Sequence, residues 1–323
     1  MKRSAIGVDI GGTTVKLGLV DTRGKIILKD VFPTTQGKTR AALLEGMAQH
    51  IRAMILKAGA KGFHVSGVGV GAPGPIDTRR GFVYFFPNIP GWKNTFLTKL
   101  LSAKLKIPVR VDNDANAMAL GEVTFGAGRN TKNAIALTLG TGVGGGMVID
   151  GKLFAGATFS AAEIGHIIIN ENGPRCGCGN NGCIEAYVGN GHFVRYVRER
   201  LARGEKSILN AWIKKERREL SPLLVAQAAR QGDAFSKKIW QETGEHLGTM
   251  LAGLVNTLNP EKIILGGGIA QNRELLFPVV TRTIHKKAFP IAARSVRVVP
   301  AKLGVDAGLI GAAALILSGE KNS

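Results

Sequence analysis

All three cysteines of the 323-residue chain lie in one short glycine-rich segment, RCGCGNNGC at 175–183. Cys176, Cys178 and Cys183 follow a Cys-x-Cys-x4-Cys spacing, and the glycines between them permit the tight turns that converging side chains need. Three kinds of chemistry would use such a cluster: a disulfide with one spare thiol, a reactive nucleophile, or three ligands of a metal ion. A nucleophile needs only one thiolate, and a chain of this length does not need a disulfide framework. A metal site is the interpretation that uses all three side chains.

A glycine-rich turn near the N-terminus is a second chemical feature. In DIGGTTVK at 9–16, Gly11 and Gly12 let the backbone approach a phosphate group and present its N–H groups to it. Asp9, at the end of the preceding apolar segment, is placed to hold Mg²⁺ through water. The turn offers three further donors, which are Thr13, Thr14 and Lys16. Taken alone, this segment could equally be an ordinary glycine hairpin.

Two more glycine clusters follow apolar segments farther along the chain. LGTGVGGG at 139–146 repeats this glycine-rich pattern after an apolar segment, and it adds Thr141 and Gly142 to the candidate phosphate contacts. The bare backbone of Gly267 and Gly268, after a third apolar segment, could lie against an adenine or a ribose. The repetition favours a nucleotide site over three unrelated turns.

Short polar side chains gather in VDNDANA at 111–117, between an apolar segment and a helical one. A helix N-terminus needs only one such residue as its cap, so the surplus indicates a second role. Phosphoryl transfer to a sugar hydroxyl requires a carboxylate that accepts the hydroxyl proton. Asp114 is the predicted base and Asn113 a predicted sugar contact, while Asp112 is the less favoured base.

The apolar pattern places these motifs on an α/β scaffold. It predicts strands at 5–9, 15–20, 25–31, 65–70, 109–111, 134–139, 147–149 and 263–265, and helices at 40–58, 95–105, 115–122, 234–258 and 306–317. The order strand, glycine turn, strand occurs near the N-terminus and again near residue 134. This repetition predicts a duplicated domain with a cleft between the copies.

The composition bounds the class of protein. A formal net charge of +20 would suit a polyanion, but the densest basic run, 214–219, contains acids and aromatic residues are scarce. We therefore expect a basic solvated surface and no nucleic-acid partner. The start MKRSAIGVDI is predicted to be a first strand rather than a signal peptide, and no apolar stretch reaches membrane-spanning length. These features and the few cysteines predict a cytoplasmic protein without a membrane partner.

Together the motifs resemble the ROK family, and most closely its bacterial glucose kinases. The matching segments occur in the family's order over nearly the whole chain: DIGGTTVKLGLVD at 9–21, GAPGPID at 71–77, NIPGW at 88–92, DNDANAMALGE at 112–122, LGTGVGGG at 139–146, EIGH at 163–166, CGCGNNGCIEA at 176–186 and LGGGIA at 265–270. One departure is Ala162, where family members commonly have glycine. Ala162 borders the predicted sugar pocket. The departure therefore concerns which sugar is bound and does not affect the predicted phosphoryl transfer.

The resemblance implies a two-domain actin-like ATPase (ribonuclease H-like) sugar kinase fold with an interdomain cleft. We expect a smaller α/β domain of 1–119 plus 303–323 and a larger α/β domain of 120–302 that carries the zinc-binding loop. The implied reaction is the ATP-dependent phosphorylation of D-glucose to glucose 6-phosphate, with Mg²⁺ and ATP as donor, by a homodimer. Alternative acceptors are fructose, mannose, N-acetylglucosamine and N-acetylmannosamine.

A sugar-responsive regulator is an alternative from another class, because the family includes repressors. Such proteins carry a DNA-binding helix-turn-helix ahead of the kinase-like region. We expect no room for one here, because the phosphate motif already begins at Asp9.

The resemblance also implies roles at matching positions. Asp114 corresponds to the catalytic base, and the nucleotide site corresponds to the turn at 11–14 with Thr141, Gly142, Gly267 and Gly268. Sugar contacts are implied at Gly74, Asn88, Asn113, Asp114, Glu163, His166 and Glu185. The family supports His166 as the fourth ligand of a structural Cys3His zinc site, with its other ring nitrogen left for a sugar hydroxyl. Four protein ligands leave no open position, so this zinc would not act as a Lewis acid.

Overall fold

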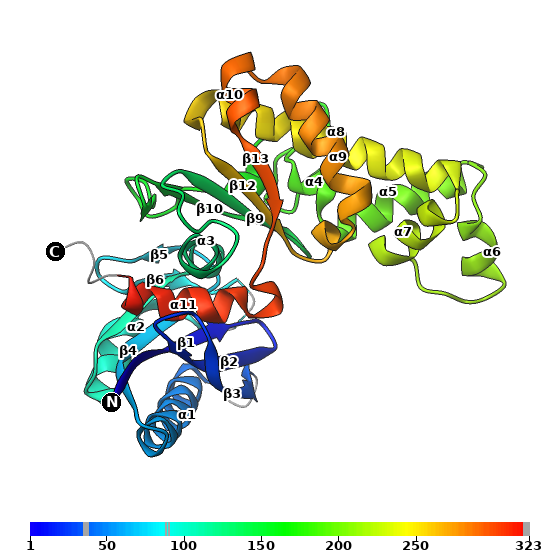
Figure 1. The fold of residues 1–323 in the computed structure, drawn as a ribbon. Helices are drawn as coiled ribbons and strands as arrows, with labels where there is room; N and C mark the ends of the chain where they lie inside the picture. The colour runs from blue at the N-terminus through cyan, green and yellow to red at the C-terminus, as the bar shows by residue number, and fades with distance from the viewer. Residues whose placement is uncertain (35–38, 88, 90, 319–323) are drawn as a thin grey trace. The chain divides into compact units, whose positions relative to one another are not determined.

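The computed structural model describes residues 1–34, 39–87, 89 and 91–318. Contacts divide the chain into two units (Figure 1). Unit 1 comprises Met1–Lys132, Gly146–Ala162 and the chain from Ala301 on, and unit 2 comprises Asn133–Gly145 and Glu163–Pro300. The predicted domain bounds, 1–119 with 303–323 and 120–302, stay a prediction; their first boundary falls inside helix α3 (Asp114–Phe125).

The first five-stranded sheet belongs to unit 1 and has the strand order β3-β2-β1-β4-β8. Strand β1 pairs antiparallel with β2 and parallel with β4, which in turn pairs parallel with β8. Side chains on its central strands are almost wholly buried, as strands covered on both faces require. The strands are β1 (Lys2–Ile10), β2 (Thr14–Asp21), β3 (Ile26–Pro33), β4 (Phe63–Ala72) and β8 (Val109–Asn113).

The second five-stranded sheet repeats this topology, with the order β11-β10-β9-β12-β13. Its strand β9 lies beside β10 and parallel to β12, and β12 is parallel to β13. The shared strand order agrees with the duplication that the sequence predicts. The strands are β9 (Ala134–Leu139), β10 (Val143–Ile149), β11 (Lys152–Leu153), β12 (Lys262–Gly266) and β13 (Arg297–Pro300).

The predicted turn at 140–146 is shorter than expected, because β10 already begins at Val143. The reason is packing rather than turn chemistry. A Cβ on Gly146 would lie 2.5 Å from the Ala119 Cβ, so this glycine lets the strand approach α3 closely. The predicted helix at 95–105 begins only at Leu97, because 93–96 pairs in a small sheet that the sequence did not reveal.

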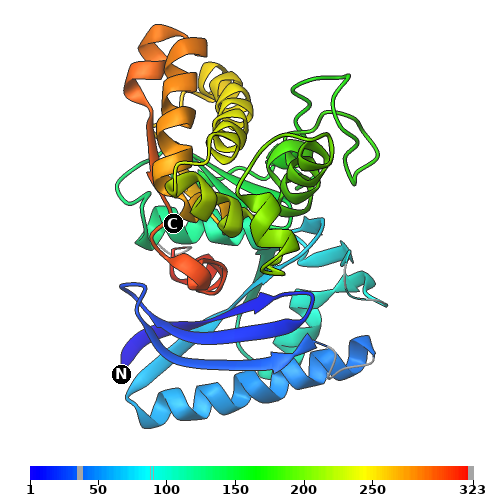
Figure 2. The ribbon, with the colours of Figure 1, turned by 90° about the vertical axis from the view of Figure 1, so that its right-hand side faces the viewer.

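That small sheet has the order β5-β6-β7, with β5 (Ile76–Asp77), β6 (Phe82–Phe85) and β7 (Lys93–Phe96). Helices α1 and α11 lie on opposite faces of the first sheet (Figures 1 and 2). Across the described ranges, no helix is both long and apolar enough to cross a membrane. The helices other than α3 are α1 (Arg40–Ala60), α2 (Leu97–Leu105), α4 (Glu185–Val188), α5 (Asn190–Ala202), α6 (Leu209–Lys214), α7 (Pro222–Arg230), α8 (Ala234–Leu258), α9 (Arg273–Lys287), α10 (Pro290–Ser295) and α11 (Ala307–Leu317).

Helix α11 packs at backbone distance against the first sheet and α3. A Cβ on Gly7 of β1 would lie 2.0 Å from the Leu309 carbonyl oxygen, and one on Gly69 of β4 would lie 1.7 Å from the Ala312 carbonyl oxygen. A Cβ on Gly311 would be 1.8 Å from the Ala117 carbonyl oxygen of α3. These three positions accept only glycine, because backbone atoms cannot move aside as a flexible side chain could.

A buried carboxylate also joins α3 to the segment that precedes α11. Glu122 is fully buried, and its Oε1 accepts backbone N–H groups from Lys302 at 2.9 Å and Leu303 at 2.8 Å. Its Oε2 accepts the Ala127 N–H at 2.7 Å. Three backbone donors satisfy the buried charge, and they connect parts of the chain that are far apart in sequence.

We expect Glu122→Gln to destabilise the protein. The amide keeps the shape of the side chain, but its N–H₂ group must face either the Ala127 N–H or the N–H groups of Lys302 and Leu303, which need an acceptor. The hydrogen bonds to the remaining amide oxygen lose the contribution of the negative charge. The expected loss is about 2 kcal/mol in the free energy of unfolding, measured by urea denaturation. The exposed Glu219→Gln is the control and should leave the midpoint unchanged; equal midpoints for both variants would contradict this role.

Candidate functional site

The glycine turn between β1 and β2 keeps the hairpin geometry that its sequence predicts. Gly11 N–H donates to the Thr14 carbonyl at 2.9 Å, and Asp9 and Lys16 are paired across the two strands. Thr34 Oγ1 donates to the Gly11 carbonyl at 2.8 Å, an anchor that the sequence did not reveal. Gly12 and Thr13 are exposed at the tip, where a phosphate could approach their backbone.

The electrostatics of Asp9 reflect its position under this turn. Burial raises the pKa of Asp9, and the nearby Lys16 ammonium opposes that rise. A Cβ on Gly308, in the first turn of α11, would lie 3.2 Å from the Asp9 carboxylate. Lys16 and the N-terminus of α11 both favour the charged form of this carboxylate, and a bound cation would favour it further.

Asn113 is the N-cap of α3. Its Oδ1 accepts the N–H groups of Ala115 at 2.9 Å and Asn116 at 3.3 Å. Its Nδ2 donates to the Gly74 carbonyl at 3.3 Å, so the loop after β4 and the start of α3 are joined. Gly74 has a φ of 88°, in the left-handed region that favours glycine. These two predicted sugar contacts thus lie together in unit 1; their role toward a sugar stays a prediction.

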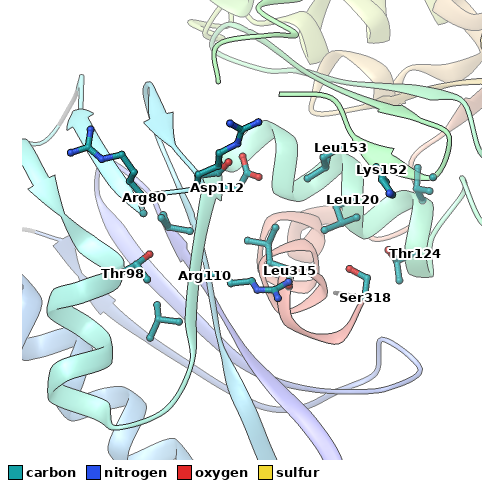
Figure 3. A pocket seen from close by; sticks show the side chains of 17 residues that line it. Arg80, Thr98, Arg110, Asp112, Leu120, Thr124, Lys152, Leu153, Leu315 and Ser318 are labelled. Atoms are coloured by element: carbon teal, nitrogen blue, oxygen red, sulfur yellow. The ribbon is translucent and has the colours of Figure 1, made fainter. Parts of the chain in front are cut away.

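Asp112 lies where β8 leads into α3 (Figure 3). It is buried, and its Oδ1 accepts the Asn113 N–H at 2.7 Å and the Asn116 Nδ2 at 2.9 Å. Burial raises the pKa of this carboxyl, while these two donors oppose the rise. Its ranking as the less favoured base stays a prediction.

Asp114 is the first residue of α3 and is half-buried. Its Oδ1 accepts the Ala115 N–H at 2.8 Å, which fixes the carboxylate at the start of the helix. A general base must be able to reach the proton that it removes, and among the two aspartates beside the cap only Asp114 is more than slightly exposed.

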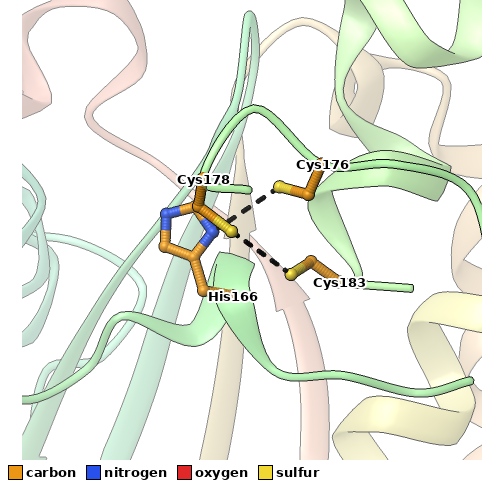
Figure 4. A group of neighbouring side chains, drawn as sticks. All are labelled: His166, Cys176, Cys178 and Cys183. Atoms are coloured by element: carbon orange, nitrogen blue, oxygen red, sulfur yellow. Dashed lines mark hydrogen bonds between the residues drawn. The ribbon is translucent and has the colours of Figure 1, made fainter. Parts of the chain in front are cut away.

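The predicted metal ligands come together in unit 2 (Figure 4). The ligand atoms of His166, Cys176, Cys178 and Cys183 all lie within 4.8 Å of one another. Cys178 Sγ and Cys183 Sγ are 3.6 Å apart, and Cys176 Sγ lies 3.8 Å from His166 Nδ1. All three cysteines are free thiols. The structure therefore contains a Cys3His group of possible metal ligands.

The geometry of this group fits a tetrahedral ion. Zn–S bonds of about 2.3 Å place two sulfurs of a tetrahedron ~3.8 Å apart, close to the sulfur separation seen here. The imidazole turns Nδ1 toward Cys176, which leaves Nε2 for another partner. Burial raises the pKa of the Cys183 thiol to about 12, so an ionised sulfur there depends on a nearby cation.

Backbone pairing brings the histidine and the cysteines together. Ile169 N–H donates to the Gly182 carbonyl at 2.9 Å, and Ile184 N–H donates to the Ile167 carbonyl at 2.9 Å. This pairing places His166 beside Cys183 although they are far apart in the chain. A Cβ on Gly182 would lie 1.6 Å from the Asn170 carbonyl oxygen, so the loop closes only with glycine there.

Glu185 joins the metal-ligand group to the second glycine turn. Its Oε2 accepts the Val143 N–H at 2.9 Å, and its Oε1 lies 3.7 Å from Cys176 Sγ. A Cβ on Gly142 would lie 2.3 Å from Oε2. The sequence predicts Glu185 as a sugar contact and Gly142 as a nucleotide contact; the structure brings the two side by side in unit 2.

The remaining predicted site residues are distributed as follows. The Glu163 carbonyl accepts the His166 N–H at 3.0 Å, so both lie in the same 3-10 turn. Gly267 has a φ of 87° and packs on the Leu139 backbone, with exposed Gly268 beside it, and Thr141 is exposed. Asn88 lies outside the described residues.

Ala162, the residue that departs from the family resemblance, has a backbone conformation that favours glycine. Its φ of 66° lies in the left-handed region, where an alanine costs about 1 kcal/mol relative to glycine. A glycine at this position would adopt this conformation without strain. The difference therefore concerns backbone energy directly before Glu163 and His166.

We expect Gly142→Ala to break the link between Glu185 and the glycine turn. The added methyl would displace the carboxylate and leave the Val143 N–H without its acceptor, at a cost of about 1–3 kcal/mol in unfolding free energy. Gly140→Ala is the matched control, because no atom lies within 4 Å of its Cβ position. Thermal unfolding of both variants measures the difference, and an equal loss in Gly140→Ala would contradict the prediction.

Comparison with known proteins identifies relatives along the whole chain. The ROK family profile matches residues 5–318. A glucokinase from Thermotoga maritima is 38% identical over 316 residues, which cover 98% of this chain and 98% of that protein. A xylose repressor from Caldicellulosiruptor bescii is 31% identical over 315 residues, 98% of this chain and 78% of the repressor.

Solved structures agree with this result. The crystal structure of a ROK family glucokinase from Streptomyces griseus, in complex with glucose and AMPPNP, is 36% identical to this chain and has a TM-score of 0.77. The similarity covers 98% of this chain and 100% of that one. It confirms the predicted α/β sugar kinase fold of the actin-like ATPase class. The chain therefore belongs to the ROK family.

Proposed function

We propose that this chain is a glucokinase, which transfers the γ-phosphoryl group of Mg²⁺-bound ATP to the 6-hydroxyl of D-glucose. The observation that carries the proposal is the full-length similarity to proteins named glucokinase, one of which was crystallised with glucose and AMPPNP. The glycine turns, the capped helix with Asp114 and the Cys3His group are the features of this chain that would perform the reaction.

We assign Asp114 as the base that accepts the proton of the 6-hydroxyl while the phosphoryl group arrives. Asn113 and Gly74, which hydrogen bond to each other, would orient the sugar from unit 1. Glu163, His166 and Glu185 would contribute sugar contacts from unit 2, with Asn88 as a further contact.

The phosphates of ATP would be held by backbone N–H groups of the turn at 11–14 and of Thr141 and Gly142. Asp9 would hold Mg²⁺ through water, and Thr13, Thr14 and Lys16 would add donors. Gly267 and Gly268 would lie against the nucleoside. Mg²⁺ supplies neutralisation of the developing phosphate charge when it is bound.

Two alternatives to glucose phosphorylation are consistent with membership of the ROK family. Kinases of the same chemistry could accept fructose, mannose, N-acetylglucosamine or N-acetylmannosamine. A sugar-responsive regulator is the other, but the named repressor, at 31% identity, is less similar to this chain than the glucokinase, at 38%. We further propose, from the family alone, a homodimer that serves glycolysis in the cytoplasm.

A coupled ADP-release assay over a panel of these sugars tests the proposal. Glucose should give the highest kcat/KM, and Asp114→Ala should lower kcat for glucose by about 10²–10⁴-fold while glucose binding, measured by calorimetry, persists. Activity on another sugar with none on glucose would overturn the assigned substrate.

Asp112→Asn is the control for this variant. It keeps the Oδ1 acceptor for Asn113 and Asn116 and should retain kcat within about tenfold of the parent enzyme, since a single lost charge–dipole contact is worth ~1 kcal/mol. A collapse of kcat in Asp112→Asn together with an active Asp114→Ala would move the base to Asp112.

We propose that the Cys3His group binds zinc in a structural role. The sulfur separation and the facing Nδ1 support this, as does the absence of an open position in a four-ligand site. Zinc would fix the orientation of the His166 ring, so that Nε2 is presented to a sugar hydroxyl. The metal would thereby support sugar binding without taking part in the chemical step.

We expect Cys178→Ser to lose zinc, stability and sugar affinity together. Cys178 is exposed and is not a predicted sugar contact, so any rise in the glucose KM would come through the metal. Metal analysis should fall from about one zinc per chain to well below it, with a lower unfolding midpoint. Glu171→Gln, in the same loop, is the control; zinc loss with unchanged KM and midpoint would refute the link.

A further inference from the structure

A cavity of about 490 Å³ lies within unit 1, apart from the residues assigned to ATP and glucose (Figure 3). Its walls come from β8, α3, the end of α11, the turn between β10 and β11, and 78–81. None of the described residues that line it is a predicted sugar or nucleotide contact. The volume is in the range of sites for small molecules.

The lining of this cavity is strongly basic. Arg79, Arg80, Arg110 and Lys152 contribute to it, and Asp112 is the only acid among its seventeen described lining residues. The Arg79 guanidinium lies over the Phe159 ring and the Arg80 guanidinium over the Phe82 ring. Arg110 Nη1 donates to the Leu315 carbonyl at 3.0 Å, at the end of α11. Several cations around one concave surface attract an anion such as a phosphate monoester.

Asp112 gives the cavity a second kind of contact. It is 7% exposed, and both of its hydrogen bonds, from Asn113 and Asn116, reach Oδ1. Oδ2 accepts no hydrogen bond from the described part of the chain. Oδ2 is not among the fully buried polar atoms that lack a partner in the described residues, so it keeps access to solvent, and a ligand hydroxyl could donate a hydrogen bond to it.

Other lining groups suit a polyhydroxylated molecule. The Oγ1 of Thr98 is buried and has no hydrogen-bond partner among the described residues. Thr124 and Ser318 bring further hydroxyl groups to the wall. Leu120 and Leu153 add apolar surface against which the carbon face of a sugar ring could pack.

We propose that this cavity is a second ligand site, which binds a sugar phosphate. The cationic side chains, Arg110 and Lys152 foremost, hold the phosphate group, and Asp112 accepts a sugar hydroxyl. The ligand could be the product of the proposed reaction or another hexose phosphate, because both present the same chemistry.

This site is linked to the turn that carries Asp114. The donors to Asp112 Oδ1 are the backbone of Asn113 and the side chain of Asn116, the residues on either side of the Asp114–Ala115 pair. A ligand that reorients Asp112 changes these two hydrogen bonds. The cavity is therefore a regulatory site, through which a sugar phosphate acts on the start of α3.

Calorimetric titration tests the site on the full chain saturated with glucose and AMPPNP, so that sugar phosphates cannot enter the catalytic site. The probes are glucose 6-phosphate, fructose 6-phosphate and inorganic phosphate. We expect one hexose phosphate to bind once per chain and more tightly than inorganic phosphate. Comparing the two hexose phosphates identifies whether product or another metabolite is preferred.

Lys152→Glu should weaken this binding by at least about tenfold, because it replaces an attractive charge with a repulsive one at the phosphate. Lys25→Glu is the matched control: it makes the same charge change on an exposed lysine of unit 1 that does not line the cavity. Thr124→Trp, which fills the cavity, should abolish binding while the unfolding midpoint shows that the variant is folded.

Three outcomes would overturn the proposal. One is the absence of binding to the saturated protein, or displacement of the probe when glucose and AMPPNP are added, which would place the probe in the catalytic site. Another is equal weakening by Lys152→Glu and Lys25→Glu, which would indicate only the general charge of the chain. The third is inorganic phosphate binding as tightly as both hexose phosphates. Each outcome is a binding result, so it is distinct from a failure to phosphorylate glucose.

Discussion

The backbone contact of α11 with the first sheet and α3 is the constraint on which the rest of unit 1 depends. Gly7, Gly69 and Gly311 allow main chains to touch without a side chain between them. Such contacts have almost no freedom to adjust, because a shift of one element produces an immediate backbone clash. The end of β1, which carries Asp9, and the start of α3, which carries Asp114, are therefore held at fixed positions around one helix.

Unit 2 positions its predicted site residues by a different means. Its cysteine loop has little apolar core of its own: Cys176, Cys183 and Ala186 form only a small buried cluster. The order comes instead from backbone pairing, from the convergence of four metal-ligand side chains and from the hydrogen bond between Glu185 and Val143. A loop held in this way depends on a few polar contacts, so its geometry is sensitive to each of them.

The sequence predicted the elements and motifs that depend on local pattern. The alternating and helical periodicities located most strands of the two five-stranded sheets and the helices α1, α2, α3, α8 and α11, but gave no range for α5 or α9. The cysteine spacing with the family resemblance located the metal-ligand group that the structure assembles. The contacts that the sequence did not reveal join residues far apart in the chain. Glu122 meets Lys302, and Thr34 meets Gly11. No local pattern signals such partners, because their proximity follows from the packing of α11 and β3 and not from neighbouring residues.

Three carboxylates around α3 show how packing decides chemistry among residues of the same type. Glu122 is fully buried, and three backbone N–H groups occupy its oxygens, so it can only connect segments. Asp112 is buried and uses one oxygen for hydrogen bonds within the chain, which leaves the other for a ligand in the cavity. Asp114 stays half-exposed at the first position of the helix. A proton acceptor must be reached by its substrate, so the proposed role of Asp114 as the base depends on its accessibility rather than on its residue type.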